Sequence, residues 1–218
     1  MKQRILILGA GKVGTALGLA WLRAGHDVRF GVPVPDSTKY PALPAGRLQP
    51  ASALRDAQLV VLAVPWAAAS TALAALGDLN GVIVIDCTNP LGMGQNGLQL
   101  TLGFDTSGAE QLAQHAPGAS LFKTLNQTGA ENMADAGAYT ATPVMFVAGD
   151  DSRHKPLVLQ LVADLGFDAI DAGPLRAARL LEPLAMLWID LATKLGHPRD
   201  FAFARVRHHP SPQPEAPQ

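Results

Sequence analysis

Short apolar runs alternate with helical stretches along almost the whole chain. Each run is nearly continuous in Val, Ile and Leu, which is typical of strands buried on both faces of a parallel sheet. The pattern predicts strands at residues 4–9, 27–32, 59–64, 81–87, 120–125, 143–149 and 168–172. It predicts helices at residues 12–24, 66–76, 107–114, 128–135, 152–165 and about 175–195. This alternation predicts an α/β fold with a doubly wound, mostly parallel sheet.

Several helix ends carry signals of their own. Ser107 and Glu110 have the spacing of a capping box, in which each side chain bonds to the backbone N–H of the other residue. Gly25 and Gly166 follow predicted helices and can adopt the left-handed conformation that ends a helix.

Two segments do not fit the alternation. Residues 33–50 are rich in proline and are expected to be a loop where many such folds have a helix. Residues 88–105 are rich in Gly, Asn and Gln and are expected to form a long loop, which in a compact domain is often a binding loop. Residues 206–218 are expected to be a mobile, proline-rich tail, which leaves residues 1–205 as one domain.

Residues 57–77 contain no charged side chain and are numerous enough to span a bilayer. Pro65 divides this stretch into a branched aliphatic run and an alanine-rich run. A strand, a turn and a helix explain it better than a membrane span.

The composition excludes several classes of partner and of chemistry. Charged residues are 16% of the 218 residues and the net charge is -1, which gives no general attraction for nucleic acid or an anionic membrane. Cys87 is the lone cysteine, so an internal disulfide and a thiolate zinc cluster are ruled out. The N-terminus shows no signal-peptide pattern, and we expect a cytoplasmic protein. The histidines include no helical pair and no G-x-S-x-G elbow occurs, so we expect neither a metal site nor a hydrolase.

The clearest chemical motif is Gly9-Ala10-Gly11-Lys12-Val13-Gly14, between the first predicted strand and the first helix. In this G-x-G-x-x-G spacing Gly9 permits a tight turn, Gly11 lets a pyrophosphate approach the backbone, and Gly14 lets the helix lie close to the sheet. The free N–H groups of the helix N-terminus would then face the phosphates. The motif predicts dinucleotide binding by the 1–205 domain; the alternative is a structural glycine turn.

The end of the second strand bears on the choice of dinucleotide. An acidic residue there would hold the ribose hydroxyls of NAD, but the chain has Val32-Pro33. Its absence favours NADP, with NAD as the alternative. Ser37, Thr38 and Lys39 are the candidate contacts of the 2′-phosphate, with Arg55 a weaker one; a solvated loop lysine is the alternative for Lys39.

Polar residues follow the later strands at the edge where ligands of this fold bind. Trp66 either walls the cofactor cleft or packs at a helix start. Asn89 either bonds to the nicotinamide ribose or carboxamide, or forms an Asx turn before proline. Asn126 and Gln127 are expected to face the hydride-transfer space, whereas we expect Lys123 to be structural, without an evident partner.

These motifs together resemble the NADPH-dependent reductases of the deazaflavin coenzyme F420 and the related cytosolic domains of six-transmembrane metalloreductases. The likeness covers about residues 4–205. Beyond the glycine motif it rests on Val64-Pro65-Trp66, Asp86-Cys87-Thr88-Asn89-Pro90, Lys123-Thr124-Leu125-Asn126, Ala148-Gly149-Asp150-Asp151, and Asp171-Ala172-Gly173-Pro174-Leu175 with Arg179-Leu180-Leu181-Glu182. Such proteins are often dimeric and seat the acceptor over the nicotinamide.

The resemblance implies roles for several residues. Residues 11–13 would hold pyrophosphate, Pro65 and Trp66 would flank the cofactor, and Leu125, Asn126 and Gln127 would lie near the nicotinamide and the acceptor. Family members commonly have Ser-Arg where this chain has Val32-Pro33, which leaves NAD open as the cofactor. The acceptor is expected to be a deazaflavin, with a flavin or another small molecule as the alternative.

The sequence thus predicts an oxidoreductase that passes hydride between NADP(H) and a flat, flavin-like or deazaflavin acceptor. Such transfer chiefly needs donor and acceptor held close together, which suits a chain without an evident catalytic dyad. The alternatives are a reductase of a small carbonyl or imine and a binding module that senses NAD(P)H without turnover.

The last predicted helix carries a stripe of leucines. They are Leu180, Leu184, Leu187, Leu191 and Leu195, with Trp188 beside them. The stripe either covers the sheet or is shared with a second copy of the chain in a homodimer.

Overall fold

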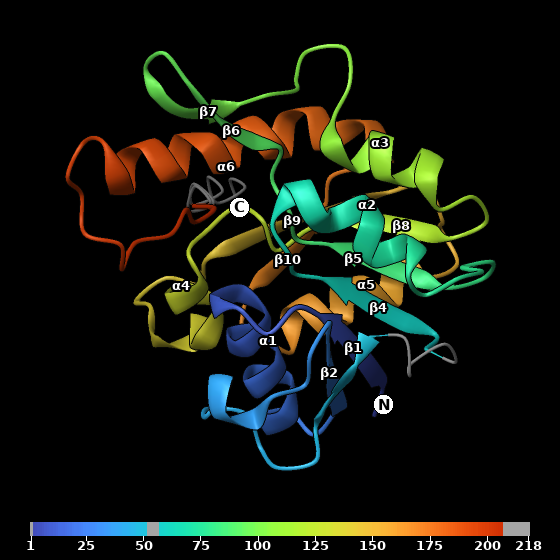
Figure 1. The fold of residues 1–218 in the computed structure, drawn as a ribbon. Coiled ribbons are helices and arrows are strands. Elements are labelled where there is room, and N and C mark those ends of the chain that lie inside the picture. Colours follow the sequence, from blue (N-terminus) through green and yellow to red (C-terminus); the bar gives the residue numbers. More distant parts are fainter. Residues whose placement is uncertain (1, 52–56, 207–218) are drawn as a thin grey trace, which may run out of the picture.

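A central eight-stranded sheet runs through the computed structural model, which describes residues 2–51 and 57–206 (Figure 1). Its strands are β1 (Arg4–Leu8), β2 (Asp27–Val32), β3 (Leu48–Pro50), β4 (Leu59–Leu62), β5 (Ile83–Asp86), β8 (Ser120–Lys123), β9 (Val144–Gly149) and β10 (Asp168–Asp171). They lie in the order β10-β9-β8-β5-β4-β1-β2-β3. The predicted doubly wound, mostly parallel sheet is confirmed.

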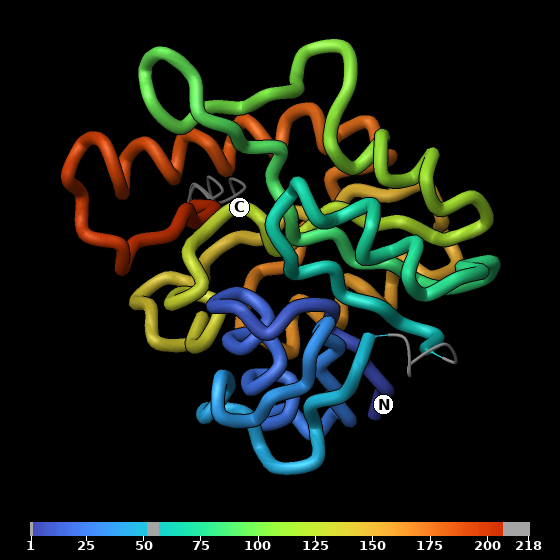
Figure 2. Tube along the Cα trace, viewed as in Figure 1, coloured from blue at the N-terminus to red at the C-terminus, as the bar shows by residue number. Residues whose placement is uncertain are grey.

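The chain changes direction across the sheet at β1. From β1 it proceeds outward through β2 and β3, and then returns to the other side of β1 to form β4 and β5. Figure 2 shows this division, with the blue N-terminal part at one end of the molecule. The carboxyl ends of β1 and β4 therefore flank the switch point, where ligands of open α/β sheets bind.

The strands β9 and β10 run opposite to the other six. β9 pairs antiparallel with β8, so that Lys123 lies opposite Ala148, and β10 pairs parallel with β9. Strand direction could not be predicted from the apolar runs, because a strand buried on both faces has the same pattern in either direction. As a result, the start of β9 projects beyond the carboxyl end of β8.

Helices cover both faces of the sheet. One face is covered by α1 (Lys12–Arg23), α4 (Ala130–Ala134) and α5 (Lys155–Ala163), and the other by α2 (Trp66–Ala74) and α3 (Gly108–His115). The first layer is also tied by a buried hydrogen bond, because the Trp21 indole of α1 donates to the Leu161 carbonyl of α5 at 2.8 Å. The predicted last helix begins as a 3₁₀ turn at Leu175–Ala177 and continues as α6 (Ala178–Thr193).

The predicted helix-end signals are largely confirmed. Gly25 and Gly166 have φ angles of 91° and 96°, in the left-handed region. The Ser107 hydroxyl accepts the Glu110 amide of α3 at 3.2 Å. Only half of the predicted capping box forms, because the Glu110 carboxylate pairs with the Arg179 guanidinium and with the Ser107 hydroxyl.

Both predicted loops contain short strands that the sequence analysis missed. Residues 33–50 include a 3₁₀ turn at Ser37–Lys39 and end in β3, an edge strand where Pro50 is tolerated. Residues 88–105 include a separate hairpin of β6 (Leu91–Gly94) and β7 (Gly97–Leu100), closed by Gly97 with a φ of 91°.

The uncharged stretch 57–77 forms β4, a turn and α2, as predicted. Within residues 2–51 and 57–206, no helix has both the length and the apolar character needed to cross a bilayer. Arg55 and residues 207–218 of the predicted tail lie outside the described residues.

Candidate functional site

The turn between β1 and α1 is shaped by two glycines that have no room for a side chain. Gly9 has a φ of 101°, and a Cβ placed on it would lie 2.5 Å from the Ala63 carbonyl oxygen at the end of β4. A Cβ on Gly14 would overlap the Gly9 carbonyl oxygen. These two positions let the strand turn sharply and bring α1 against the sheet, as the motif predicts.

Gly11 differs from the other two glycines of the motif in having open space around it. A Cβ placed on it would meet no atom within 4 Å, so the space above it is open. Gly11 is the N-cap of α1 and supplies no side-chain cap, so the backbone N–H groups of the first turn stay available to an anion. The Thr15 hydroxyl braces the turn by donating to the Ala10 carbonyl at 3.2 Å. This arrangement suits a pyrophosphate.

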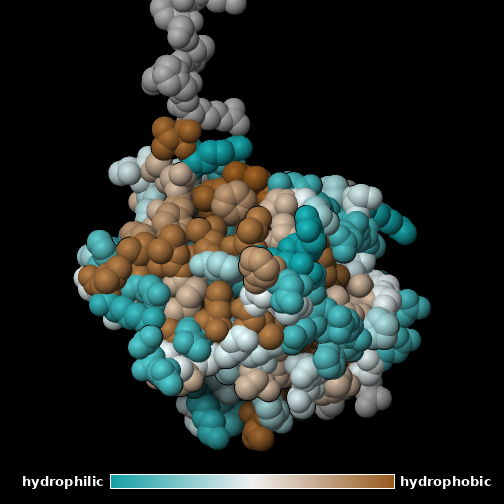
Figure 3. Space-filling view, turned by 90° about the horizontal axis from the view of Figure 1, so that it is seen from above, coloured by the Kyte–Doolittle hydropathy of each residue, from teal (hydrophilic) through white to brown (hydrophobic). Residues whose placement is uncertain are grey.

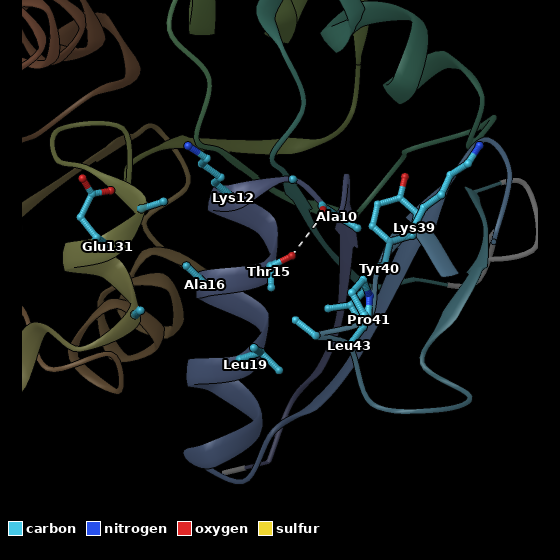
Figure 4. A pocket seen from close by; sticks show the side chains of 14 residues that line it. Ala10, Lys12, Thr15, Ala16, Leu19, Lys39, Tyr40, Pro41, Leu43 and Glu131 are labelled. Atoms are coloured by element: carbon cyan, nitrogen blue, oxygen red, sulfur yellow. Dashed lines mark hydrogen bonds between the residues drawn. The ribbon is translucent and has the colours of Figure 1, made fainter. Parts of the chain in front are cut away.

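A groove of about 560 Å³ begins at this turn and follows the outer face of α1 (Figure 4). Its walls come from α1, α4 and the segment after β2; they include Ala10, Gly11, Lys12, Thr15, Leu19, Lys39, Tyr40, Leu43 and Glu131. Figure 4 shows Lys12 and Lys39 on opposite sides of Ala10 at one end of the groove. Neither lysine forms an ion pair with a described carboxylate, since Glu131 pairs with Arg199 at 2.5 Å. The mouth of the groove is therefore positively charged.

The predicted phosphate contacts Ser37, Thr38 and Lys39 form the 3₁₀ turn after β2, and only Lys39 also lines the groove. Asp36, which the sequence analysis did not single out, caps this turn. Its Oδ1 accepts the Thr38 amide at 3.0 Å and the Thr38 hydroxyl at 2.6 Å. The Thr38 hydroxyl is thus held inside the turn, whereas the Lys39 side chain is exposed.

Pro65 and Trp66 lie at the start of α2, after the carboxyl end of β4. Pro65 is the N-cap and the half-buried Trp66 is the first helical residue, with its ring packed against Gly108 at the start of α3. Trp66 also lines a cavity of about 180 Å³ between α2 and α3, with Gln111 and His115. Trp66 is not one of the described residues that line the groove at Gly11. The structure therefore contains the packing contact at a helix start that was the alternative to a place in the wall of the cofactor cleft.

Asn89, Asn126 and Gln127 form one amide network beyond the ends of β5 and β8. Asn126 Nδ2 donates to Asn89 Oδ1 at 2.9 Å, and Asn89 Nδ2 donates to the Asn126 carbonyl at 3.0 Å. The Gln127 side chain accepts a hydrogen bond from the Phe146 amide and donates one to the Phe146 carbonyl, each at 3.0 Å. It thus pairs with β9 in the way that the backbone of an adjacent strand would. Asn126 and Gln127 are buried and Asn89 is half-buried, so Asn89 is the most exposed residue of the three.

The backbone that carries these amides is strained. Leu125 has a φ of 57° although it is not glycine, and its side chain is buried in the core. Such a conformation persists only where the surroundings enforce it, and it is most common at functional sites. It turns the chain at the end of β8 so that Asn126 reaches both Asn89 and the Leu181 carbonyl of α6.

The partners of Lys123, which the sequence could not identify, are Asp86 and Glu182. The Lys123 ammonium lies 2.9 Å from Asp86 Oδ2 and 3.1 Å from Glu182 Oε1, and it also donates to the Thr88 carbonyl. Glu182 in turn accepts the Gly108 and Ala109 amides of α3 at 2.9 and 3.1 Å. All three charged side chains are almost fully buried, so the predicted structural role of Lys123 is supported.

The ionisation of this cluster follows from its geometry. Burial acts to lower the pKa of Lys123, but the Asp86 and Glu182 carboxylates outweigh it and raise the pKa above its usual value. Burial, reinforced by the charge of Asp86, raises the pKa of the neighbouring Cys87 thiol. Cys87 is therefore a protonated thiol at neutral pH and supplies no thiolate nucleophile.

A Ser, His and Asp trio lies at the opposite edge of the sheet, where β8 begins and β9 ends. The Ser120 hydroxyl donates to Asp151 Oδ2 at 2.5 Å, and His154 Nδ1 lies 2.7 Å from the same oxygen. These hydrogen bonds, first from Ser120 and then from His154, lower the pKa of Asp151. Because the serine bonds to the carboxylate, the trio lacks the geometry of a hydrolytic triad.

Comparison with known proteins identifies the family of this chain. Residues 4–90 match the family described as NADP oxidoreductase, coenzyme F420-dependent. A crystal structure of a putative F420-dependent NADP-reductase from Arthrobacter sp. FB24 is 31% identical, with a TM-score of 0.83 over 94% of this chain and 100% of that chain.

One curated protein and one further solved structure are less similar to the chain. The metalloreductase STEAP3 of Rattus norvegicus is 27% identical over 188 residues, which are 84% of this chain and 37% of that protein. The chain thus spans little more than a third of that curated relative. The reductive aminase of Aspergillus terreus in complex with NADPH and ethyl levulinate is 20% identical, covering 90% of this chain and 63% of that chain. Its TM-score of 0.64 shows a shared fold.

The three glycines of the motif should respond differently to alanine. Gly14→Ala should lower the free energy of unfolding by about 1–3 kcal/mol, because its Cβ would overlap backbone atoms. Gly11→Ala should change stability by less than about 1 kcal/mol and raise the NADPH dissociation constant roughly tenfold, because its Cβ would occupy the open phosphate position. Urea denaturation and calorimetry measure the two effects. Unchanged NADPH affinity in Gly11→Ala would contradict the phosphate site.

Removal of the Lys123 charge should be strongly destabilising. Lys123→Met leaves Asp86 and Glu182 buried without a cation, which should lower the free energy of unfolding by about 3–5 kcal/mol. As the matched control, Arg205→Met at the exposed Asp168 pair should cost about 0–1 kcal/mol.

The pH dependence of this effect has a defined sign. Because folding raises the pKa of Lys123, its stabilisation is fully present below the ordinary value of 10.5 and is lost as pH rises through the higher folded value. The difference between wild type and Lys123→Met should stay constant from neutral pH upward and shrink only in strong alkali. A difference that disappears at neutral pH would contradict a charged cluster.

Proposed function

Because the chain belongs to the coenzyme F420-dependent NADP oxidoreductase family, we propose that it transfers hydride between NADP(H) and a flat, flavin-like or deazaflavin acceptor. As a member of this family it is an NADP-dependent oxidoreductase. The acceptor and the positions of its contacts are the parts that we propose.

The observation that carries the proposal is the open position above Gly11. At this point three features coincide: a glycine whose Cβ direction is free, the uncapped first turn of α1, and Lys12, which forms no ion pair with a described carboxylate, at the mouth of the groove. A pyrophosphate needs close backbone approach, N–H donors and positive charge, and this turn offers all three. We assign the pyrophosphate to the amides of residues 11–13.

We assign the 2′-phosphate of NADP to the segment after β2. Lys39 supports this assignment, because its ammonium is exposed, lacks an ion-pair partner among the described residues and lies beside the groove. The backbone of Ser37 and the turn that Asp36 fixes would hold Lys39 in place. Asp36 lies beyond the strand tip and is engaged with Thr38, so it does not take the position of the NAD-selecting carboxylate.

We assign the nicotinamide and the acceptor to the carboxyl ends of β5 and β8, with Pro65 and Trp66 flanking the cofactor. The half-buried Asn89 is the candidate contact of the nicotinamide ribose or carboxamide. Asn126 and Gln127 would act mainly by fixing Asn89 and the strained Leu125 turn, because their amides are already bonded inside the protein.

The bound nicotinamide supplies the hydride, and the protein supplies position. The buried ionisable groups nearby are not available as proton donors or nucleophiles, because Lys123 is held between two carboxylates and the Cys87 thiol is protonated. Hydride transfer to a flat acceptor chiefly needs the two reacting carbons close together. An edge of the sheet whose buried ionisable groups are already paired or neutral therefore fits the reaction.

The acceptor class can be tested directly. Stopped-flow mixing of NADPH-loaded protein with deazaflavin F420, FMN or FAD should oxidise NADPH, and the Gly11→Ala variant should be slower at subsaturating NADPH. Gly137→Ala is the control, since its Cβ would lie 3.8 Å from the nearest atom. Oxidation only by a small ketone or imine would assign the carbonyl or imine reductase alternative. Tight NADPH binding without oxidation by any acceptor would identify a sensor.

The role of Lys39 can be separated from the pyrophosphate site. Lys39→Ala should raise the NADPH dissociation constant roughly tenfold, as expected for loss of one charge-assisted contact, and leave the NADH constant unchanged. Lys2→Ala, an equal loss of charge at the exposed N-terminal end, should change neither. Calorimetry with both nucleotides measures this, and equal weakening of both would contradict a 2′-phosphate contact.

A further inference from the structure

The chain returns from the end of α6 to α4 through residues 197–203, which we call the strap. The buried Asn132 of α4 anchors the strap, because its Nδ2 donates to the carbonyls of Arg199 and Phe201 at 3.1 and 2.8 Å. The Trp188 indole of α6 donates to the same Phe201 carbonyl at 2.9 Å, and its ring stacks on the Phe201 ring. The backbone of the strap is therefore fixed to both helices, which gives the Arg199 side chain a defined place.

Arg199 differs from the basic residues of α6 in the element that it reaches. The surface over α6 is largely apolar (Figure 3), with Leu180 and Leu187 exposed. Arg179 of α6 pairs with α3 at 2.7 Å, and Lys194 at the C-cap pairs with its own helix at 2.7 Å. Arg199 instead extends to α4, which forms one wall of the groove at Gly11.

The partner of Arg199 on α4 is the Glu131 carboxylate, which it meets with two of its guanidinium nitrogens. Nε lies 2.5 Å from Oε1, and a terminal nitrogen lies 3.4 Å from Oε2. The guanidinium carbon also lies 5.1 Å from the centre of the Trp188 ring, an arrangement that favours a cation. A Cβ on Gly129 would lie 2.7 Å from the Trp188 ring and 2.8 Å from the Glu131 carboxylate, so the glycine leaves room for both partners. Arg199 is thus held by packing as well as by charge.

Glu131 is the acidic side chain among the described residues that line the groove. Figure 4 shows its carboxylate and the Lys12 ammonium at the same end of the groove, on α4 and α1. Burial acts to raise the pKa of Glu131, but the hydrogen bond from Arg199 and the charges of Arg199 and Lys12 outweigh it and lower the pKa. Glu131 is therefore an anion at neutral pH, and it lies close enough to Lys12 for the two charges to interact.

A Glu131 carboxylate without its partner would oppose the binding of a dinucleotide in two ways. It would repel the pyrophosphate assigned to the amides of residues 11–13, because like charges at a binding site are strongly unfavourable. It would also draw the long, flexible Lys12 side chain into an ion pair of its own. Arg199 prevents both, since it already occupies the carboxylate.

We propose that Arg199 is a positioning residue of the dinucleotide site, which neutralises Glu131 and thereby keeps the Lys12 ammonium available to the pyrophosphate. This inference rests on the proposed function, because it needs the pyrophosphate at Gly11. The strap follows the last helix and the groove begins at the first, so residues from both ends of the chain act on one nucleotide site.

The affinity of the full chain for NADP⁺ tests the proposal. Arg199→Gln leaves the Glu131 carboxylate without its partner and should raise the NADP⁺ dissociation constant roughly tenfold, as expected when a negative charge faces a phosphate. Arg205→Gln is the matched control, because it removes the same charge from an exposed pair with Asp168 on β10, at the far edge of the sheet. It should change the constant by less than about twofold, since charges that far apart are screened. Calorimetry measures both constants.

A double substitution separates the charge of Arg199 from its packing. Glu131→Gln combined with Arg199→Gln should restore the wild-type dissociation constant, because the carboxylate that opposes the nucleotide is gone. The strap has then still lost its ion pair and its cation over Trp188. If Arg199 only held the strap in place, the double variant would bind NADP⁺ as weakly as Arg199→Gln does.

Glu131→Gln alone provides a test that does not depend on the folding of an Arg199 variant. It should bind NADP⁺ at least as tightly as the wild type, because it removes a negative charge and keeps Arg199. Weaker binding would assign Glu131 to a direct contact with the nucleotide and overturn the inference.

The remaining outcomes distinguish this inference from the proposed function. Equal NADP⁺ affinity of Arg199→Gln and the wild type, or a double variant that stays weak, would overturn the inference and leave the proposed function in place. A wild-type chain that binds neither NADP⁺ nor NADPH would overturn both.

Discussion

The buried ammonium of Lys123 is the interaction on which the geometry of the candidate site depends. Through Asp86 it holds β5 to β8, and through Glu182 it holds α6 and the start of α3 to the same two strands. Charges buried this deeply are stable only when every partner is in place. The cluster therefore fixes the relative position of four elements, and two of them end beside the amides of Asn89 and Asn126.

Residue patterns that act locally could be predicted from the sequence. The glycine motif is an example, because the left-handed φ of Gly9 and the contact of Gly14 with the Gly9 carbonyl both arise within one strand, one turn and one helix. Gly25 and Gly166 are predictable for the same reason, since each ends the helix just before it. The alternation of apolar runs likewise predicted the layered fold, because burial on both faces leaves a direct trace in composition.

The features that were missed depend on residues far apart in the chain. Lys123 pairs with Asp86 and Glu182 on other elements. The Glu110 carboxylate bonds to Arg179, which lies 69 residues away, and to the Ser107 hydroxyl instead of the Ser107 backbone amide. The reversal of β9 and β10 has no sequence signal, because direction does not change an apolar run. The β6–β7 hairpin was hidden by its glycines, which favour a loop by composition although they serve the turn here.

The reversed β9 has a consequence for how this domain can be joined to others. Its projecting start receives the last described residues, since the Val144 amide donates to the Phe203 carbonyl at 2.8 Å and Pro143 bridges to Ala204. The chain therefore leaves the domain at the carboxyl edge of the parallel strands, whereas it enters at their amino edge through β1. A module fused after Val206 would be tethered on the side where redox chemistry is proposed, and one fused before β1 would be held on the far side.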